Sequence, residues 1–307
     1  PNINIIMKSQ NLFNIDNPVY EDLEKNILLN KKNFSLFNEC TRDNNIRVIK
    51  DNKTGIIFLE KFRTDENYYR KIKLKGSDKS TKNKGNIHTK KKILNLSFLK
   101  DDERRIDQFY KQAVNKRILD FGCGYGGFAS RASKIASQVF VSELRTDCLN
   151  KLKKNKNLLF YDHKIKELDS IFLFHVLEHL PKQIDILKKL KKSLKKEGKI
   201  IIEVPSATDY LLNFKKFREF TFWSEHLVLH TKKSLRSFLS KAGYKNIIIK
   251  NFQRYNFVNH YNWIFNGTPG GHDTKIAHQD AAFIQKKYNK ILDNLDITDT
   301  LIAIAKK

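Results

Sequence analysis

Cysteine is scarce in this sequence, which has only Cys40, Cys123 and Cys148 among its 307 residues. A disulfide framework needs several cysteines at regular spacings, and a structural zinc site needs closely spaced cysteine or histidine pairs. Three scattered cysteines suit neither arrangement. The sequence therefore predicts a chain without disulfides, and no metal is expected.

Long apolar runs are also missing. No stretch of eighteen apolar residues occurs, and the first residues lack the charged-then-apolar pattern of a signal peptide. We therefore expect no membrane span and a cytoplasmic location. The hydrophobic content of 40% still suffices for a core, in one large domain or two smaller ones.

Acidic residues are few relative to basic ones, with 33 Asp and Glu against 59 Lys and Arg, so the formal net charge is +26. Such a charge is typical of proteins that bind nucleic acid or another anionic surface. However, the lysines are spread along the whole chain. Between Lys188 and Lys199 they alternate with an apolar stripe, which predicts a solvated helix face rather than a nucleic-acid groove. A basic surface would still favour a phosphorylated or nucleotide-linked substrate.

The most informative segment is 117–127, Arg-Ile-Leu-Asp-Phe-Gly-Cys-Gly-Tyr-Gly-Gly. A short apolar strand leads directly into a glycine-rich turn, and a helical pattern follows. Glycines let the backbone turn sharply and approach a ligand at the start of the helix. Glu143 ends the next apolar strand, where an acid can bind the two ribose hydroxyls of an adenosine.

Two cofactors fit this turn at first sight. Gly122, Gly124 and Gly127 also satisfy the dinucleotide pattern G-x-G-x-x-G. Asp120, just before the glycines, favours another ligand, because a carboxylate there would repel a pyrophosphate. It would attract the positively charged amino-acid end of S-adenosylmethionine.

From these residues onward the chain resembles the class I S-adenosylmethionine-dependent methyltransferases, whose first motif is acid-x-Gly-x-Gly-x-Gly. Residues 175–181, His-Val-Leu-Glu-His-Leu-Pro, are similar to the family's segment after the fourth strand, and 198–205 to its fifth strand. Residues 224–231, Ser-Glu-His-Leu-Val-Leu-His-Thr, are similar to an element of a subgroup that includes bacterial sugar and saccharide-pathway methyltransferases. The resemblance covers 104–307 and implies S-adenosyl-L-methionine as cofactor.

The alternation of strand and helix patterns predicts an α/β fold, a Rossmann-like doubly wound sheet that is mostly parallel. The resemblance implies an antiparallel last strand pair. The predicted elements are a helix at 98–114, strand 117–121, helix 126–136, strand 138–142, helix 145–154, strands 157–161 and 169–174, helix 182–196, strand 199–204, a helix capped by Thr231 and ended by Gly243, and strands 244–250 and 299–305.

The chain divides into an N-terminal region, 1–97, and a methyltransferase domain, 98–307. In the first part, residues 47–50 and 55–59 flank a turn and predict a hairpin. The Lys-rich stretch 75–92 predicts a loop, either a linker or a lid over the substrate. Residues 254–297 are too long for a hairpin loop, so we expect an insertion that builds a substrate pocket.

The resemblance also assigns a set of cofactor-binding residues. They are Asp120, Gly122, Gly124, Gly126, Glu143, Asp162 and His175. Asp162 follows the third strand, where an acid would meet the adenine amino group. His175 follows the fourth strand, near the expected methyl group, where lining the pocket is favoured over catalysis.

Methyl transfer from a sulfonium needs positioning and a base for the acceptor's proton. The resemblance assigns the base to His226, with Glu225 before it and His175 as the other candidate; a histidine that merely ties down a loop is the structural alternative. Acceptor binding is expected from polar and aromatic residues of the insertion, namely Arg254, Tyr255, Asn259, Trp263 and His272. A structural cover over the sheet edge is the alternative for this segment.

The function that these patterns favour is methylation of a small polar acceptor, a sugar or nucleotide-linked sugar of a surface-polysaccharide pathway. One alternative is an RNA or protein methyltransferase, supported by the charge. Against this alternative, the chain has no Asn-Pro-Pro-Tyr-type element after the fourth strand and has His175-Val-Leu-Glu178 there instead. A scaffold that binds the cofactor without catalysis is the third possibility.

Overall fold

The computed structural model describes residues 13–27, 29–72, 101–270 and 279–307. Two sequence-based predictions, the loop at 75–92 and the substrate contact of His272, therefore lie outside the described residues. No helix in the described ranges is long and apolar enough to cross a membrane.

A seven-stranded sheet forms the centre of the molecule, in the order β10-β11-β8-β7-β4-β5-β6. The five neighbouring strands β8, β7, β4, β5 and β6 are parallel to one another. Strand β11 runs antiparallel to both of its neighbours, β8 and β10. The predicted α/β fold with its antiparallel last pair is confirmed. The strands are β4 (Arg117–Phe121), β5 (Gln138–Ser142), β6 (Leu158–Phe160), β7 (Leu168–Phe174), β8 (Leu194–Pro205), β10 (Lys245–Phe252) and β11 (Thr300–Lys306).

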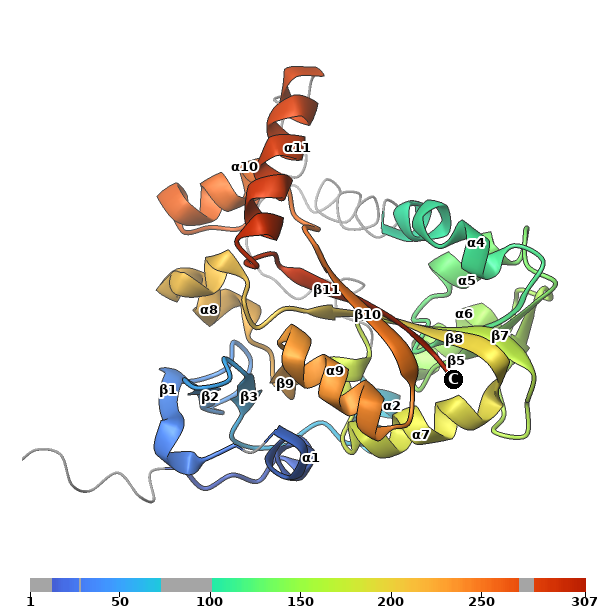
Figure 1. Cartoon of the computed structure of the whole chain (residues 1–307), viewed down its shortest axis with the longest axis horizontal. Helices are drawn as coiled ribbons and strands as arrows, with labels where there is room; N and C mark the ends of the chain where they lie inside the picture. Colours follow the sequence, from blue (N-terminus) through green and yellow to red (C-terminus); the bar gives the residue numbers. More distant parts are fainter. Residues whose placement is uncertain (1–12, 28, 73–100, 271–278) are drawn as a thin grey trace, which may run out of the picture.

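Both faces of this sheet are covered by helices (Figure 1). Successive strand residues point to opposite faces, so Leu119 packs in one core and its neighbour Ile118 in the other. The first core contains side chains of α7 (Gln183–Ser193) and α9 (Lys232–Lys241), and the second contains those of α4 (Tyr110–Ala113), α5 (Gly127–Ala132) and α6 (Thr146–Leu152). The apolar runs of the strands are thus explained by burial on two sides.

The parallel strands end at one common edge, and the segments that leave this edge carry the predicted site residues. The glycine turn follows β4, Glu143 follows β5, and His175 follows β7. In open α/β sheets, ligands bind at the carboxyl ends of the strands. A hollow of about 350 Å³ lined by Lys116, Asp169 and Lys195 lies at the opposite edge, so it is not part of this site.

A second, four-stranded sheet has the order β1-β2-β3-β9. The predicted hairpin is confirmed as β2 (Val48–Asp51) and β3 (Ile57–Leu59), while β1 (Phe34–Asn38) was not predicted. The last strand, β9 (Val228–Leu229), comes from the segment just after His226. The N-terminal region therefore packs directly against the carboxyl-edge segment of the large sheet.

The remaining helices complete the fold. They are α1 (Pro18–Ile27), η1 (Lys31–Asn33), α2 (Glu66–Lys71), η2 (Leu177–His179), η3 (Tyr210–Asn213), α8 (Lys215–Thr221), α10 (Phe257–Tyr261), a π-helical turn (Asn262–Asn266) and α11 (Gln279–Asn294). The predicted insertion thus contains α10, the π-helical turn and α11, which stands out from the body in Figure 1.

Several predicted boundaries were wrong by a few residues. The helix expected at 182–196 ends at Ser193, because Leu194 already pairs with Leu168 of β7 as part of a long β8. The helix expected at 98–114 is interrupted, within its described part, at Phe109, whose ring packs against Phe172 and Phe174. By contrast, Thr231 caps α9 with a reciprocal capping box, as predicted.

Candidate active site

The glycine turn adopts the left-handed backbone that its sequence predicts. Gly122, Gly124 and Gly126 have φ values of +75°, +54° and +73°, which only glycine adopts without strain. A Cβ atom on Gly122 would lie 2.5 Å from a methyl carbon of Val176. The turn therefore needs glycine both for its backbone and for its close contact with the segment after β7.

Glu143 holds the turn from the neighbouring strand. Its carboxylate accepts hydrogen bonds from the backbone N–H of Gly124 at 2.8 Å, of Leu144 at 2.7 Å and of Arg145 at 2.9 Å. These bonds fix the carboxylate beside the glycines, at the position predicted for ribose binding. Carboxylate oxygens have further lone pairs with which to accept hydroxyl donors.

Asp120 is buried at the end of β4, with 3% of its surface exposed. Burial, together with the nearby carboxylates of Asp102 and Glu143, raises its pKa from 3.8 to about 7, against the influence of Arg105. A buried acid surrounded by other acids is stabilised by a cationic ligand. The environment thus fits the ammonium group of S-adenosylmethionine.

Asp162 lies beyond the third parallel strand, β6, and is exposed. Its carboxylate accepts a hydrogen bond from the backbone N–H of Lys164 at 2.7 Å. The residue is therefore at the carboxyl edge, in a short turn, with its side chain accessible.

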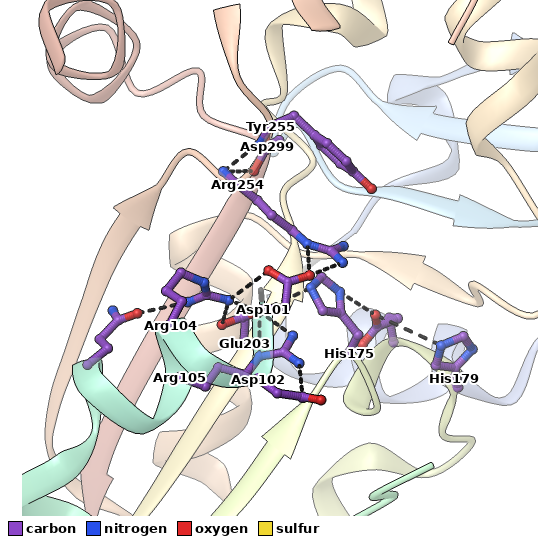
Figure 2. A network of polar contacts seen from close by, with 12 residues as sticks. Asp101, Asp102, Arg104, Arg105, His175, His179, Glu203, Arg254, Tyr255 and Asp299 are labelled. Carbon is purple, nitrogen blue, oxygen red and sulfur yellow. Dashed lines mark hydrogen bonds and ion pairs between the residues drawn. The ribbon is translucent and has the colours of Figure 1, made fainter. Parts of the chain in front are cut away.

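His175 lies between two buried carboxylates (Figure 2). Its Nδ1 is 3.3 Å from Oε1 of Glu178, and its Nε2 is 3.3 Å from Oε1 of Glu203. Burial alone would lower the pKa of His175, but the two carboxylates hold it above its usual value. The residue also has a left-handed φ of +54°, a strained conformation for a residue with a side chain.

Glu203 on β8 is the centre of the network in Figure 2. Arg104 donates to both of its oxygens at 2.9 Å, and Arg105 donates to Oε1 at 2.6 Å. Burial would raise the pKa of Glu203, but His175 and the arginines hold it well below its usual range. The helix at 101–108 is thereby fastened over the carboxyl edge.

Arg254, predicted to bind the acceptor, is held by acids in the structure. Its Nε donates to Asp101 at 2.9 Å, and its backbone N–H donates to Asp299 at 2.9 Å. The Tyr255 backbone N–H also donates to Asp299, and the residue as a whole is 36% exposed. The two side chains lie together, with the guanidinium 5.2 Å from the ring centre.

Two other acceptor candidates of the insertion, Trp263 and Asn259, are buried. Trp263 is 4% exposed and packs its ring against Phe217 and Phe220 at centroid distances of 5.1 and 4.9 Å. Asn259, also 4% exposed, donates from its side chain to the carbonyl of Gly270 at 3.0 Å. Both side chains therefore help to shape the insertion.

His226 lies in a cluster built from three distant segments. Its ring is 4.8 Å from the ring of His179 in η2. The preceding residue, Glu225, accepts from Arg145 at 3.0 Å and from the hydroxyl of Tyr68 at 3.3 Å. Burial and the neighbouring His179 lower the pKa of His226 to about 4, so its ring is neutral near pH 7.

Several residues of this edge were not identified as site residues from the sequence. Arg104 and Arg105 lie in an ordinary amphipathic helix pattern, and nothing local marks them. Glu203 was the better signal, because it is the one charge within the apolar, buried run 200–204 of β8. Tyr69 reaches His179 from the N-terminal region, which carries no recognisable motif.

Residues 96–248 match the family model described as "Methyltransferase domain". No curated protein matches the chain. Among solved structures, a SAM-dependent methyltransferase from Archaeoglobus fulgidus is 18% identical, with 68% of this chain and 94% of that one covered and a TM-score of 0.48.

Two further similar structures carry ligand or substrate names. Phosphoethanolamine N-methyltransferase 2 of Haemonchus contortus, in complex with S-adenosyl-L-methionine, is 18% identical over 68% of this chain and 52% of that chain, with a TM-score of 0.45. Magnesium protoporphyrin IX methyltransferase of Synechocystis PCC 6803, with bound SAH, is 11% identical over 74% and 90%, with a TM-score of 0.45. Likenesses this distant carry no argument about the acceptor.

The family match agrees with the geometry of the site. The left-handed glycine turn, the carboxylate of Glu143 and the buried acid Asp120 form a cradle that fits the ribose and the ammonium group of S-adenosylmethionine. This chain is a methyltransferase with S-adenosylmethionine as its cofactor.

Proposed function

We propose that the protein transfers the methyl group of S-adenosylmethionine to a small polar acceptor, a sugar or nucleotide-linked sugar of a surface-polysaccharide pathway. The main support for the location of the reaction is a contact of Val176. This residue lies against Gly122 and is followed by the Glu178–His179 pair. The histidine-rich segment is therefore adjacent to the cofactor turn. Arg145 also links the cofactor turn to the segment of His226, because it lies two residues after Glu143 and pairs with Glu225.

In this proposal, the chain positions the acceptor and removes its proton. The sulfonium of the cofactor already provides a good leaving group, so proton removal and orientation are what the side chains must supply. We assign proton removal to His226, because its ring is neutral and its lone pair is available near pH 7. His175 suits this role less well, because the two carboxylates raise its pKa and so favour the protonated ring, which donates rather than accepts.

The acceptor side of the proposal rests on the start of the insertion. Tyr255 offers an exposed ring for stacking on a sugar or base, with the Arg254 guanidinium beside it. A phosphate of a nucleotide-linked acceptor would compete with Asp101 for Arg254. The dispersed surface lysines add a general attraction for such an anionic substrate.

The test is a turnover assay that follows S-adenosylhomocysteine formation over a panel of nucleotide-linked sugars, free sugars, tRNA and basic peptides. His226→Ala should lower turnover by roughly 10²–10⁴-fold, the usual contribution of a general base, while the affinity for S-adenosylmethionine stays unchanged. His163→Ala is the matched control, since His163 is exposed on the loop after β6. Undiminished turnover in His226→Ala would refute its role, and methylation of only tRNA or peptide would refute the acceptor class.

A further inference from the structure

We propose that Glu178, His179 and His226 form a binding site for a divalent transition-metal cation. One ligand atom from each side chain can be chosen so that all three lie within 4.8 Å of one another. The three donors come from two segments, η2 and the loop before β9, which leave the sheet at its carboxyl edge. Cysteine spacing could not reveal this site in the sequence, because none of its three ligands is a cysteine.

Glu178 provides the first argument for a cation. The residue is completely buried, yet within the described part of the chain neither of its carboxylate oxygens accepts a hydrogen bond. Its neighbours there are imidazoles: His175 Nδ1 is 3.3 Å and His179 Nε2 is 4.0 Å from Oε1. Buried carboxylates usually accept hydrogen bonds as well as facing a charge; His175 supplies a charge at 3.3 Å without a hydrogen bond, so this carboxylate still requires an explanation.

The second argument is the tautomer of His179. Its Nδ1 lies 2.8 Å from the backbone carbonyl oxygen of Glu225, which can only accept a hydrogen bond. Nδ1 must therefore carry the hydrogen, and in the neutral ring Nε2 presents its lone pair toward Glu178. Histidines that bind a metal usually donate their other ring N–H to a carbonyl or carboxylate, as Nδ1 of His179 does here.

His226 supplies the third donor. The centre of its ring lies 4.8 Å from that of the His179 ring, at an interplanar angle of 63°. The backbone beside it is held through Glu225, which pairs with Arg145 at 3.0 Å. His226 thus lies next to the other two donors.

Two imidazoles and one carboxylate suit Zn²⁺, Mn²⁺, Fe²⁺ or Co²⁺ better than Mg²⁺, which prefers oxygen ligands. Three protein ligands leave coordination positions open for a hydroxyl of the acceptor. This use of the cation rests on the proposed function, although the binding itself does not. In this use His226 holds the cation and does not itself take the proton; the cation makes the hydroxyl more acidic. The cation thereby replaces the direct proton removal that the proposed function assigns to His226.

The balance of the step is simple. The hydroxyl proton leaves to solvent, and the acceptor oxygen forms its new bond to the methyl carbon. The bond between that carbon and the sulfur breaks at the same time, and the sulfur keeps the electron pair in the neutral thioether product. No oxidant or reductant is needed.

Titration of the chelator-treated, full-length protein with Co²⁺ and Zn²⁺, followed by calorimetry and by Co²⁺ absorption, tests the site without any acceptor. We expect one cation per chain in the wild type and a loss of affinity of at least 10–100-fold in Glu178→Gln and in His226→Ala. His163→Ala should bind like the wild type. Circular dichroism of each variant establishes that it is folded, and the two variants remove ligands from different segments.

Absence of stoichiometric binding in the wild type, or binding retained in both folded variants, would overturn the site. Turnover that is lost on chelation and restored by one of these cations supports its use in catalysis. Full turnover of the chelated enzyme, combined with an inactive His226→Ala, would refute the catalytic use of the cation and leave the proposed function standing. An active His226→Ala would instead contradict the proposed role of His226 itself.

Discussion

Binding of S-adenosylmethionine should release a proton from Asp120. In the unliganded protein the pKa of this buried acid is about 7, because burial and the acids Asp102 and Glu143 disfavour its charged form. The ammonium group of the cofactor would compensate these effects and favour the carboxylate. The folded, unliganded protein therefore holds a proton at pH 6 that the complex does not.

The size of the effect follows from the two pKa values. Each unit of pH well below 7 should weaken the apparent affinity by up to tenfold. Because Asp120 is half protonated at pH 7, the change between pH 7 and pH 5 approaches about 50-fold, or about 2.3 kcal/mol. Above pH 7 the affinity should level off, and it should fall again near pH 7.7–8.0, about where α-amino groups lose their proton.

The stability of the unliganded protein should change in the opposite sense. Between 3.8 and about 7 the unfolded chain has lost the proton of Asp120 while the folded chain keeps it. The unfolded state then binds fewer protons, so stability falls as pH rises through this window, by up to about 4 kcal/mol from this residue. The cofactor should therefore stabilise the fold more strongly at pH 7 than at pH 5.

Calorimetry in two buffers of different ionisation enthalpy measures the proton release directly. At pH 6, release should approach one proton per cofactor in the wild type. In Asp120→Asn the release and the pH dependence should disappear, whereas Asp107→Asn, an exposed acid on the helix at 101–108, should behave like the wild type. A wild type without proton release, or an Asn variant with the same pH dependence, would refute the reasoning.

Two further predictions concern the frame of the site. Gly122→Ala should prevent cofactor binding and lower the thermal midpoint, because its Cβ would meet Val176. Gly55→Ala, with a similar φ of +76° but 3.6 Å to its nearest atom, should cost only the roughly 1–2 kcal/mol of backbone strain; equal effects of the two would contradict the steric argument. Glu203→Gln should lower the free energy of unfolding by about 3–5 kcal/mol in urea titrations, because it removes the buried anion that Arg104 and Arg105 share. Glu197→Gln, which removes one partner of an exposed ion pair, should change the free energy of unfolding little. An equally small effect of Glu203→Gln would contradict the stabilisation that we expect from its ion pairs.

Local sequence was enough for much of the fold. The apolar strand before the glycines, the helix cap at Thr231 and the hairpin at 48–59 depend on residues close in the chain, and each was predicted correctly. Boundaries such as the end of α7 failed because a tertiary pairing, between Leu194 and Leu168, extends the strand at the expense of the helix. Periodicity alone contains no information about that pairing.

The sequence by itself determined the cofactor cradle. Glycines in left-handed backbone and acids at strand ends are local features, so their chemistry is visible before the chain folds. Only the tertiary structure decided the state of the histidines, because their partners are far away in the chain. His179 meets Tyr69 across 110 residues, and Glu203 meets Arg105 across 98. Sheet order and burial bring these groups together, and the resulting desolvation and pairing leave His226 neutral while His175 lies between two carboxylates.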